Sequence, residues 1–143
     1  MEQATITPKK INWIKLTGLA FLLHIALILI SIIEVFFYSL LISPGKDEAF
    51  YEDHANDSGP WVSGIFGSLL IFFLVRRFIK KNNNGQHLTY TIALPLIYIL
   101  LDVIILLFFN IDWNEHFPIL LMANGVKIAA AFLSYYIYKP RLA

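Results

Sequence analysis

Residues 88–111 read LTYTIALPLIYILLDVIILLFFNI, and this stretch decides the class of fold. Tyrosines aside, its only ionisable group is the carboxyl of Asp102. A helix needs about 20 mostly apolar residues to cross the hydrocarbon core of a bilayer, which is roughly 30 Å thick. The stretch meets that requirement, so we expect it to span a membrane as a helix.

Three further stretches share this character, namely residues 16–45, 58–75 and 117–138. Their only ionisable groups, again apart from tyrosine, are His24, Glu34 and Lys127. The chain of 143 residues is 58% hydrophobic, whereas soluble domains average roughly 45–50% apolar residues. A soluble helical bundle would need polar outer faces on its helices, and the run LLIFFLV at 69–75 is apolar all round. We therefore predict an all-α integral membrane protein with four transmembrane helices.

Prolines and glycines between these stretches give the expected helix boundaries. Ser43, Pro44 and Gly45 should end the first helix. Asp57 and Pro60 should begin the second, as a capping side chain and a proline of the first turn. Pro118 should likewise open the fourth helix. We expect one domain over residues 1–143, with an acidic outer loop at 44–59 and helices at about 14–43, 60–79, 88–109 and 118–138.

The basic residues lie almost entirely on one side of these predicted helices. Nine lysines and arginines fall before the first helix, between the second and third, or after the fourth, whereas the two other loops hold only Lys46. Loops rich in Lys and Arg are typically cytoplasmic, so we expect both termini to be cytoplasmic in the cell inner membrane. The run RRFIKK at 76–81 is then a turn that contacts anionic lipids rather than a nucleic-acid site.

Three ionisable residues inside the spans define a candidate site, because such residues are rare in membranes and usually functional. Counted from the expected outer helix ends at 1.5 Å per residue, Glu34, Asp102 and Lys127 lie roughly 10–14 Å below the outer boundary. We therefore expect one polar layer shared by four helices and facing outward. Residues of similar depth or on the same helix faces complete this predicted ligand or ion site, which comprises Glu34, Asp102, Lys127, Asn124, Ser68, Ser31, Tyr38 and Tyr98.

The charges of this predicted layer do not balance. Two carboxylates and one ammonium leave one negative charge in excess, and an isolated carboxylate in hydrocarbon takes up a proton. We expect Lys127 to pair with Glu34 or Asp102, while the other acid binds a proton or a cation. The alternative is a closed hydrogen-bonded network that only fixes the register of the helices. His24 is expected to be a packed or hydrogen-bonded histidine rather than a ligand.

The predicted outer loop is a second candidate site. Its carboxylates and imidazole, with a histidine from the other outer loop, suit a divalent cation such as zinc or manganese. The residues concerned are Glu52, Asp53, His54, Asp57 and His116. Their spacing matches no metal-binding motif, and a solvated acidic loop is the alternative. Apart from this divalent cation the sequence names no cofactor, and the absence of cysteine excludes disulfides and thiolate metal sites.

Three functions of different classes fit this sequence. We rank first the transport or binding of a small cationic or polar ligand with proton or cation coupling, by a homo-oligomer because four helices enclose little space. An accessory subunit docked against another membrane protein comes second, and an intramembrane enzyme acting on a lipid-linked substrate comes third. Membrane lipids are expected partners and nucleic acids are not. The glutamate of the first helix resembles that of small four-helix multidrug exporters. This chain is longer, its basic residues strongly favour one orientation in the membrane, and it adds Asp102 and Lys127. No function is therefore carried over from the resemblance.

Overall fold

The computed structural model describes residues 11–81, 86–108 and 113–139, and in this part of the chain it is helical with no strand. Its helices are α1 (Trp13–Phe37), α2 (Glu48–Lys81), α3 (His87–Phe108) and α4 (Trp113–Tyr138), with a π-helical turn η1 (Tyr38–Ile42) directly after α1. All four are long and apolar enough to span a membrane. The predicted all-α bundle of four candidate membrane spans is therefore confirmed.

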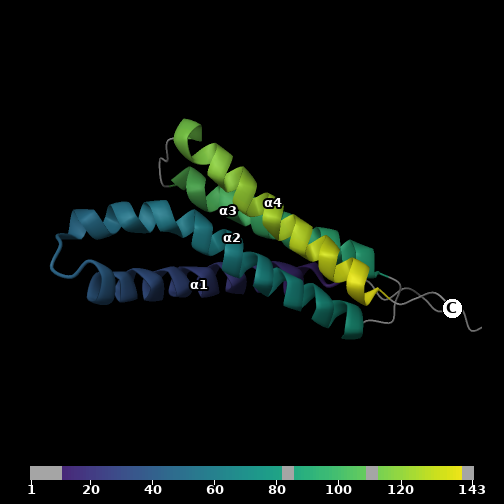
Figure 1. Cartoon of the computed structure of the whole chain (residues 1–143). Helices are drawn as coiled ribbons and strands as arrows, with labels where there is room; N and C mark the ends of the chain where they lie inside the picture. The colour runs from purple at the N-terminus through teal and green to yellow at the C-terminus, as the bar shows by residue number, and fades with distance from the viewer. Residues whose placement is uncertain (1–10, 82–85, 109–112, 140–143) are drawn as a thin grey trace, which may run out of the picture.

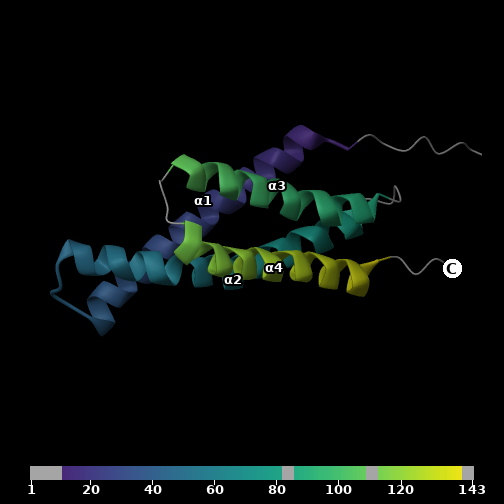
Figure 2. The same cartoon turned by 90° about the horizontal axis from the view of Figure 1, so that it is seen from above.

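In Figure 1 the helices lie close together toward the end where α4 finishes, and the pair α3 and α4 diverges from the pair α1 and α2 toward the opposite end. The most extensive packing is between α2 and α4, and α1 packs against both α3 and α2. Figure 2 shows that α1 crosses the other helices obliquely. The start of α1 and the end of α4 lie at the same end of the bundle, as an even number of spans requires.

A narrow buried stripe on each helix forms the core. On α1 it comprises Leu16, Ala20, Leu23 and Leu27, spaced by three or four residues as expected for one helix face. The opposite faces remain apolar, since Ile28 on α1 and Leu121 on α4 are examples of large side chains that are more than half exposed. Such a continuous apolar exterior suits contact with lipid chains and not with water.

Residues 34–58 form a projection that we call the arm. It comprises the end of α1, η1, a short turn and the beginning of α2, and it extends beyond the ends of α3 and α4 in both views (Figures 1 and 2). The chain reverses at Gly45, whose φ of 76° lies in the left-handed region that glycine adopts without steric cost. The hairpin of α1 and α2 therefore extends further than the hairpin of α3 and α4.

The predicted acidic loop at 44–59 is mostly helical in the structure. Helix α2 begins at Glu48, and Pro60 lies inside it instead of at its start. The side chain of Asp47 caps the new start, because its Oδ1 accepts the N–H of Phe50 at 3.1 Å. Figure 1 shows α2 bent along its course, which a proline within a helix explains because the ring displaces the preceding turn. Helix α4 likewise begins before its proline, at Trp113.

Candidate functional site

Lys127 lies at the centre of a polar network that is buried among the four helices. Its side chain is 1% exposed. The ammonium donates to Ser63 Oγ at 2.8 Å, to Asn124 Oδ1 at 3.2 Å and to the Tyr98 hydroxyl at 3.4 Å. An ammonium has three donors, so each of them meets an uncharged acceptor. The ring of Tyr98 adds a cation–π contact, with Nζ 4.4 Å from the ring centroid.

A glycine on α2 makes room for this lysine. A Cβ at Gly67 would stand 2.7 Å from Lys127 Cε and 3.3 Å from Leu27 Cδ1. The first separation is shorter than real Cβ contacts allow, so only glycine lets α2 approach the buried lysine this closely. The small residues of α2 thus have a specific role in the site, beyond the close helix packing that such residues commonly allow.

Asp102 on α3 joins the same network through a side-chain amide. Asn124 accepts from Lys127 with its oxygen and donates from Nδ2 to Asp102 Oδ2 at 3.4 Å. The amide therefore stands between the ammonium and the carboxylate. Among the residues that the structure describes, no carboxylate is within ion-pair distance of Lys127, so the expected pairing of Lys127 with Glu34 or Asp102 is wrong.

His24 on α1 is the other neighbour of Asp102. Its Nε2 lies 3.5 Å from Asp102 Oδ1, and its ring stacks on that of Tyr98 with centroids 4.0 Å apart. Its Nδ1 lies 3.0 Å from the carbonyl oxygen of Ala20, an acceptor to which this nitrogen donates. A proton on Nε2 then exists only in the imidazolium form. His24 is packed and hydrogen-bonded as expected, and it also offers a proton position beside Asp102.

Glu34 lies in the arm and not in this network. Its two carboxylate oxygens accept from His54 Nε2 at 2.8 Å and from Ser58 Oγ at 3.0 Å, both on α2. The ring of Tyr38 stacks on that of His54 at 3.5 Å between centroids. Because His24 is level with Asp102, Glu34 is displaced along α1 by ten residues, or about 15 Å. The single layer expected from the sequence is therefore split into two sites.

Two serines predicted for the site lie outside its hydrogen-bonded network. Ser68 donates to the carbonyl oxygen of Ile65 within its own helix at 2.8 Å. Ser31 is partly buried on α1 and does not line the pocket described below. Ser63, one turn and a half before Ser68 on α2, supplies the hydroxyl that meets Lys127. Ser63 was not among the residues predicted for the site.

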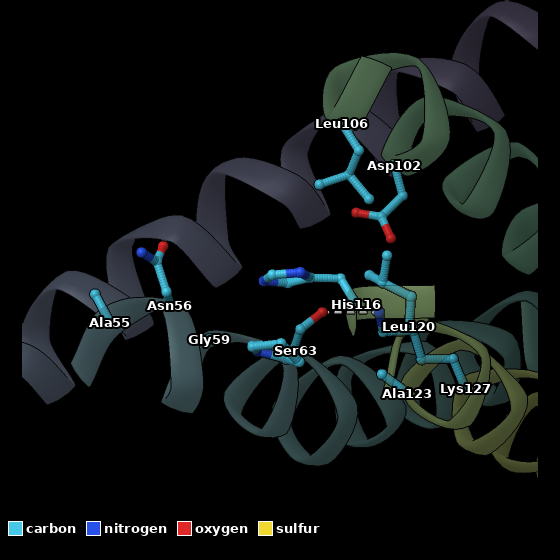
Figure 3. A pocket seen from close by; sticks show the side chains of 11 residues that line it. Ala55, Asn56, Gly59, Ser63, Asp102, Leu106, His116, Leu120, Ala123 and Lys127 are labelled. Atoms are coloured by element: carbon cyan, nitrogen blue, oxygen red, sulfur yellow. Dashed lines mark hydrogen bonds between the residues drawn. The ribbon is translucent and has the colours of Figure 1, made fainter. Parts of the chain in front are cut away.

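A pocket of about 530 Å³ lies beside the network, between α2, α3 and α4 (Figure 3). The carboxylate of Asp102 and the ring of His116 face this space, and the hydrogen bond from Lys127 to Ser63 lies at its edge (Figure 3). The residues that line it are Ala55, Asn56, Gly59, Pro60, Ser63, Asp102, Leu106, His116, Leu120, Ala123 and Lys127. The side chain of Asp102 is 18% exposed. The pocket thus brings one carboxylate and one ammonium within reach of a ligand.

The predicted metal site does not form in the described part of the chain. No three of its histidines, aspartates and glutamates are grouped so that they could hold a metal ion. Residues 48–59 are helical, and the carboxylates of Glu52, Asp53 and Asp57 are exposed on the surface of α2. His54 contacts Glu34, and His116 lines the pocket.

The arrangement can hold either a proton or a cationic ligand at Asp102, whose neighbours are an uncharged amide on α4 and an ionisable imidazole on α1. The network contains one carboxylate, one ammonium and one imidazole, so with His24 neutral its formal charge is zero. Uptake of one proton or of one cationic ligand raises that charge by one unit, and the two therefore compete. Neither a protein-family model, nor a curated protein, nor a solved structure matches this chain.

Proposed function

We propose that this chain is a small multi-pass membrane protein that binds and transports a small cationic or polar ligand at Asp102, in competition with protons. One observation carries the proposal. The Asp102 carboxylate borders a pocket of about 530 Å³ and has long contacts, 3.4 and 3.5 Å, to an amide and an imidazole. A carboxylate held so loosely beside a pocket is available to a cation.

The neighbours of Asp102 support the coupling to protons. The donors of Lys127 are occupied by neutral acceptors, so this ammonium does not cover the carboxylate directly. A proton taken up by the network adds one positive charge to it. This charge repels a cation in the pocket. Release of the proton restores the binding site for the cation. Ligand binding and deprotonation thus favour each other.

We infer further that both termini are cytoplasmic and that the pocket opens outward. The distribution of basic residues supports this orientation, with nine on the side of the termini and only Lys46 in the opposite loops. The pocket lining includes Ala55, Asn56, Gly59 and Pro60 of α2 and His116 of α4, which belong to the end of the bundle that bears the arm. With the termini inside, that end faces outward.

Cation binding at several pH values tests this function. The purified protein in lipid nanodiscs is titrated with methylammonium, tetramethylammonium and guanidinium by calorimetry between about pH 5 and about pH 8, where histidine titrates. We expect the affinity of at least one of these cations to fall as the pH is lowered. Asp102→Asn should abolish both the binding and its pH dependence.

Glu34→Gln is the matched control, because it removes the other intramembrane carboxylate, which lies in the arm. Cation binding should persist in this variant and keep its pH dependence, with only a small change in affinity, because Ala55 and Asn56 of the arm line the pocket. Binding that survives in Asp102→Asn, or that is lost in Glu34→Gln alone, would contradict the proposal.

An accessory role is the second candidate. It is favoured by the fact that the network joins all four helices. Ser63, His24, Asp102 and Lys127 come from four different helices, so the same contacts could serve to fix helix register. In that case Asp102→Asn lowers the unfolding temperature, and none of the three cations binds to the wild-type protein at any pH.

A further inference from the structure

An apolar groove of about 380 Å³ runs between α3 and α4 and meets the polar pocket at Asp102. Asp102, Leu106 and Leu120 line both spaces. Apart from Asp102 and Asn124, the groove is lined by apolar side chains and Gly125. One carboxylate therefore stands at the junction of a polar space and an apolar one.

The groove opens on the outer surface of the bundle. Leu96 from α3 is 53% exposed and Leu121 from α4 is 63% exposed, and both line it. In a bilayer this surface faces the acyl chains. An alkyl chain can therefore enter the groove sideways from the lipid and bring a polar group attached to it as far as Asp102.

We infer that the ligand is an amphiphilic cation, with a cationic head at Asp102 and an alkyl chain in the groove between α3 and α4. This inference rests on the proposed function of Asp102 and specifies the class of ligand. A small hydrophilic cation would leave the groove unused, and an uncharged chain would leave the carboxylate without a cation in direct contact. The volume of the groove equals that of roughly a dozen water molecules. This space is enough for an alkyl chain of about eight carbons.

Gly125 permits a variant that fills the groove and leaves the polar pocket untouched. It lines the groove and not the pocket. A Cβ at Gly125 meets nothing within 4 Å, so the backbone at this position accepts a side chain. Gly18 on α1 offers the matched control, since a Cβ there also meets nothing within 4 Å and it lines neither space.

The experiment compares two ammonium ions that differ only in chain length. Methylammonium and octylammonium are titrated against wild type, Gly125→Leu, Gly18→Leu and Asp102→Asn in identical nanodiscs. In wild type and Gly18→Leu we expect octylammonium to bind at least about tenfold more tightly than methylammonium, because burial of as few as two methylenes of its chain contributes that much. Gly125→Leu should remove most of that gain and leave methylammonium binding unchanged, which also shows that this variant is folded.

Two results would overturn the inference in distinguishable ways. If Gly125→Leu keeps the full gain for octylammonium while binding still requires Asp102, the groove does not hold the chain, and the proposed function stands. If neither ion binds in a manner that depends on Asp102, the proposed function fails and the inference fails with it.

Discussion

The environment of Lys127 explains why Asp102 remains available. Removing an ammonium from water costs several kcal/mol unless other groups replace its hydration. Ser63, Asn124 and the Tyr98 hydroxyl supply three acceptors, and the face of the Tyr98 ring adds electrostatic attraction. The lysine therefore needs no direct carboxylate partner. Asn124 holds the two opposite charges apart while it bonds to both, so the carboxylate borders the pocket without being covered.

Gly67→Ala should displace Lys127 and destabilise the protein. The added methyl group would come within 2.7 Å of Cε in a side chain that is 1% exposed, so the lysine has to leave its three acceptors or α2 has to shift. Overpacking of this kind costs about 1–3 kcal/mol. Thermal unfolding in detergent measures the effect, and we expect a lower midpoint together with weaker binding of the ammonium probes.

Gly64→Ala is the control for that substitution. Its Cβ would meet the Cα and Cβ of Ala123 at 3.6 Å, which is an ordinary van der Waals contact. Alanine also favours a helix over glycine by up to about 1 kcal/mol, so this variant should be as stable as wild type or more so. Equal stability of Gly67→Ala and Gly64→Ala would show that Lys127 is free to move.

The sequence predicted part of this site and misplaced the rest for a physical reason. Helical spacing and intramembrane charge were enough to select Asp102, Asn124 and Lys127, which the structure joins by hydrogen bonds. Depth was counted from the helix ends, which assumes that all the ends lie at one level. The arm breaks that assumption, because Glu34 bonds there to His54 and Ser58 and not to the network of Asp102. His24 lay on the same helical face as Glu34, and only contacts between helices could show which of the two is level with Asp102.

At the scale of elements, the length of each apolar stretch predicts a membrane span correctly. Local signals such as proline and capping residues predict the ends of the helices less accurately. The starts of α1 and α3 are within one residue of the predicted positions. The predicted start of α2 is wrong. A proline that follows an aspartate, a serine and a glycine is compatible both with the start of a helix and with a bend inside one. The cap at Asp47 and the contacts of α2 with α1 extend the helix. Such contacts between helices are not visible in local sequence.

Glu34→Gln should loosen the arm. The substitution removes the charge from the carboxylate that accepts hydrogen bonds from His54 and Ser58. Hydrogen bonds between membrane helices each stabilise the folded state by about 1 kcal/mol. We expect backbone amides of residues 48–58 to exchange roughly fivefold faster with deuterium, as measured by mass spectrometry. Asp53→Asn changes an exposed carboxylate on the same helix and should leave exchange unaltered. Equal exchange in both variants would mean that Glu34 does not hold the arm.

At the scale of the whole molecule, the bundle is narrow and presents apolar side chains on most of its outer surface. Only one stripe of each helix is buried, and residues such as Ile28, Phe66 and Leu121 face outward. Lipid chains or a second copy of the chain can cover that surface equally well in physical terms. The groups around Asp102 nevertheless all come from one chain.

Labelling with a membrane-impermeant maleimide tests the orientation, since the chain has no cysteine of its own. Glu48→Cys places a thiol at the start of α2 and Lys139→Cys places one after α4, at opposite ends of the bundle and both at exposed positions. The excess of basic residues beside the termini predicts that Glu48→Cys reacts in intact spheroplasts and that Lys139→Cys reacts only in inverted vesicles. A permeant maleimide should label both thiols in either preparation. The reverse pattern would make the pocket open to the cytoplasm, and protons driven inward would then reach Asp102 only after crossing the bundle.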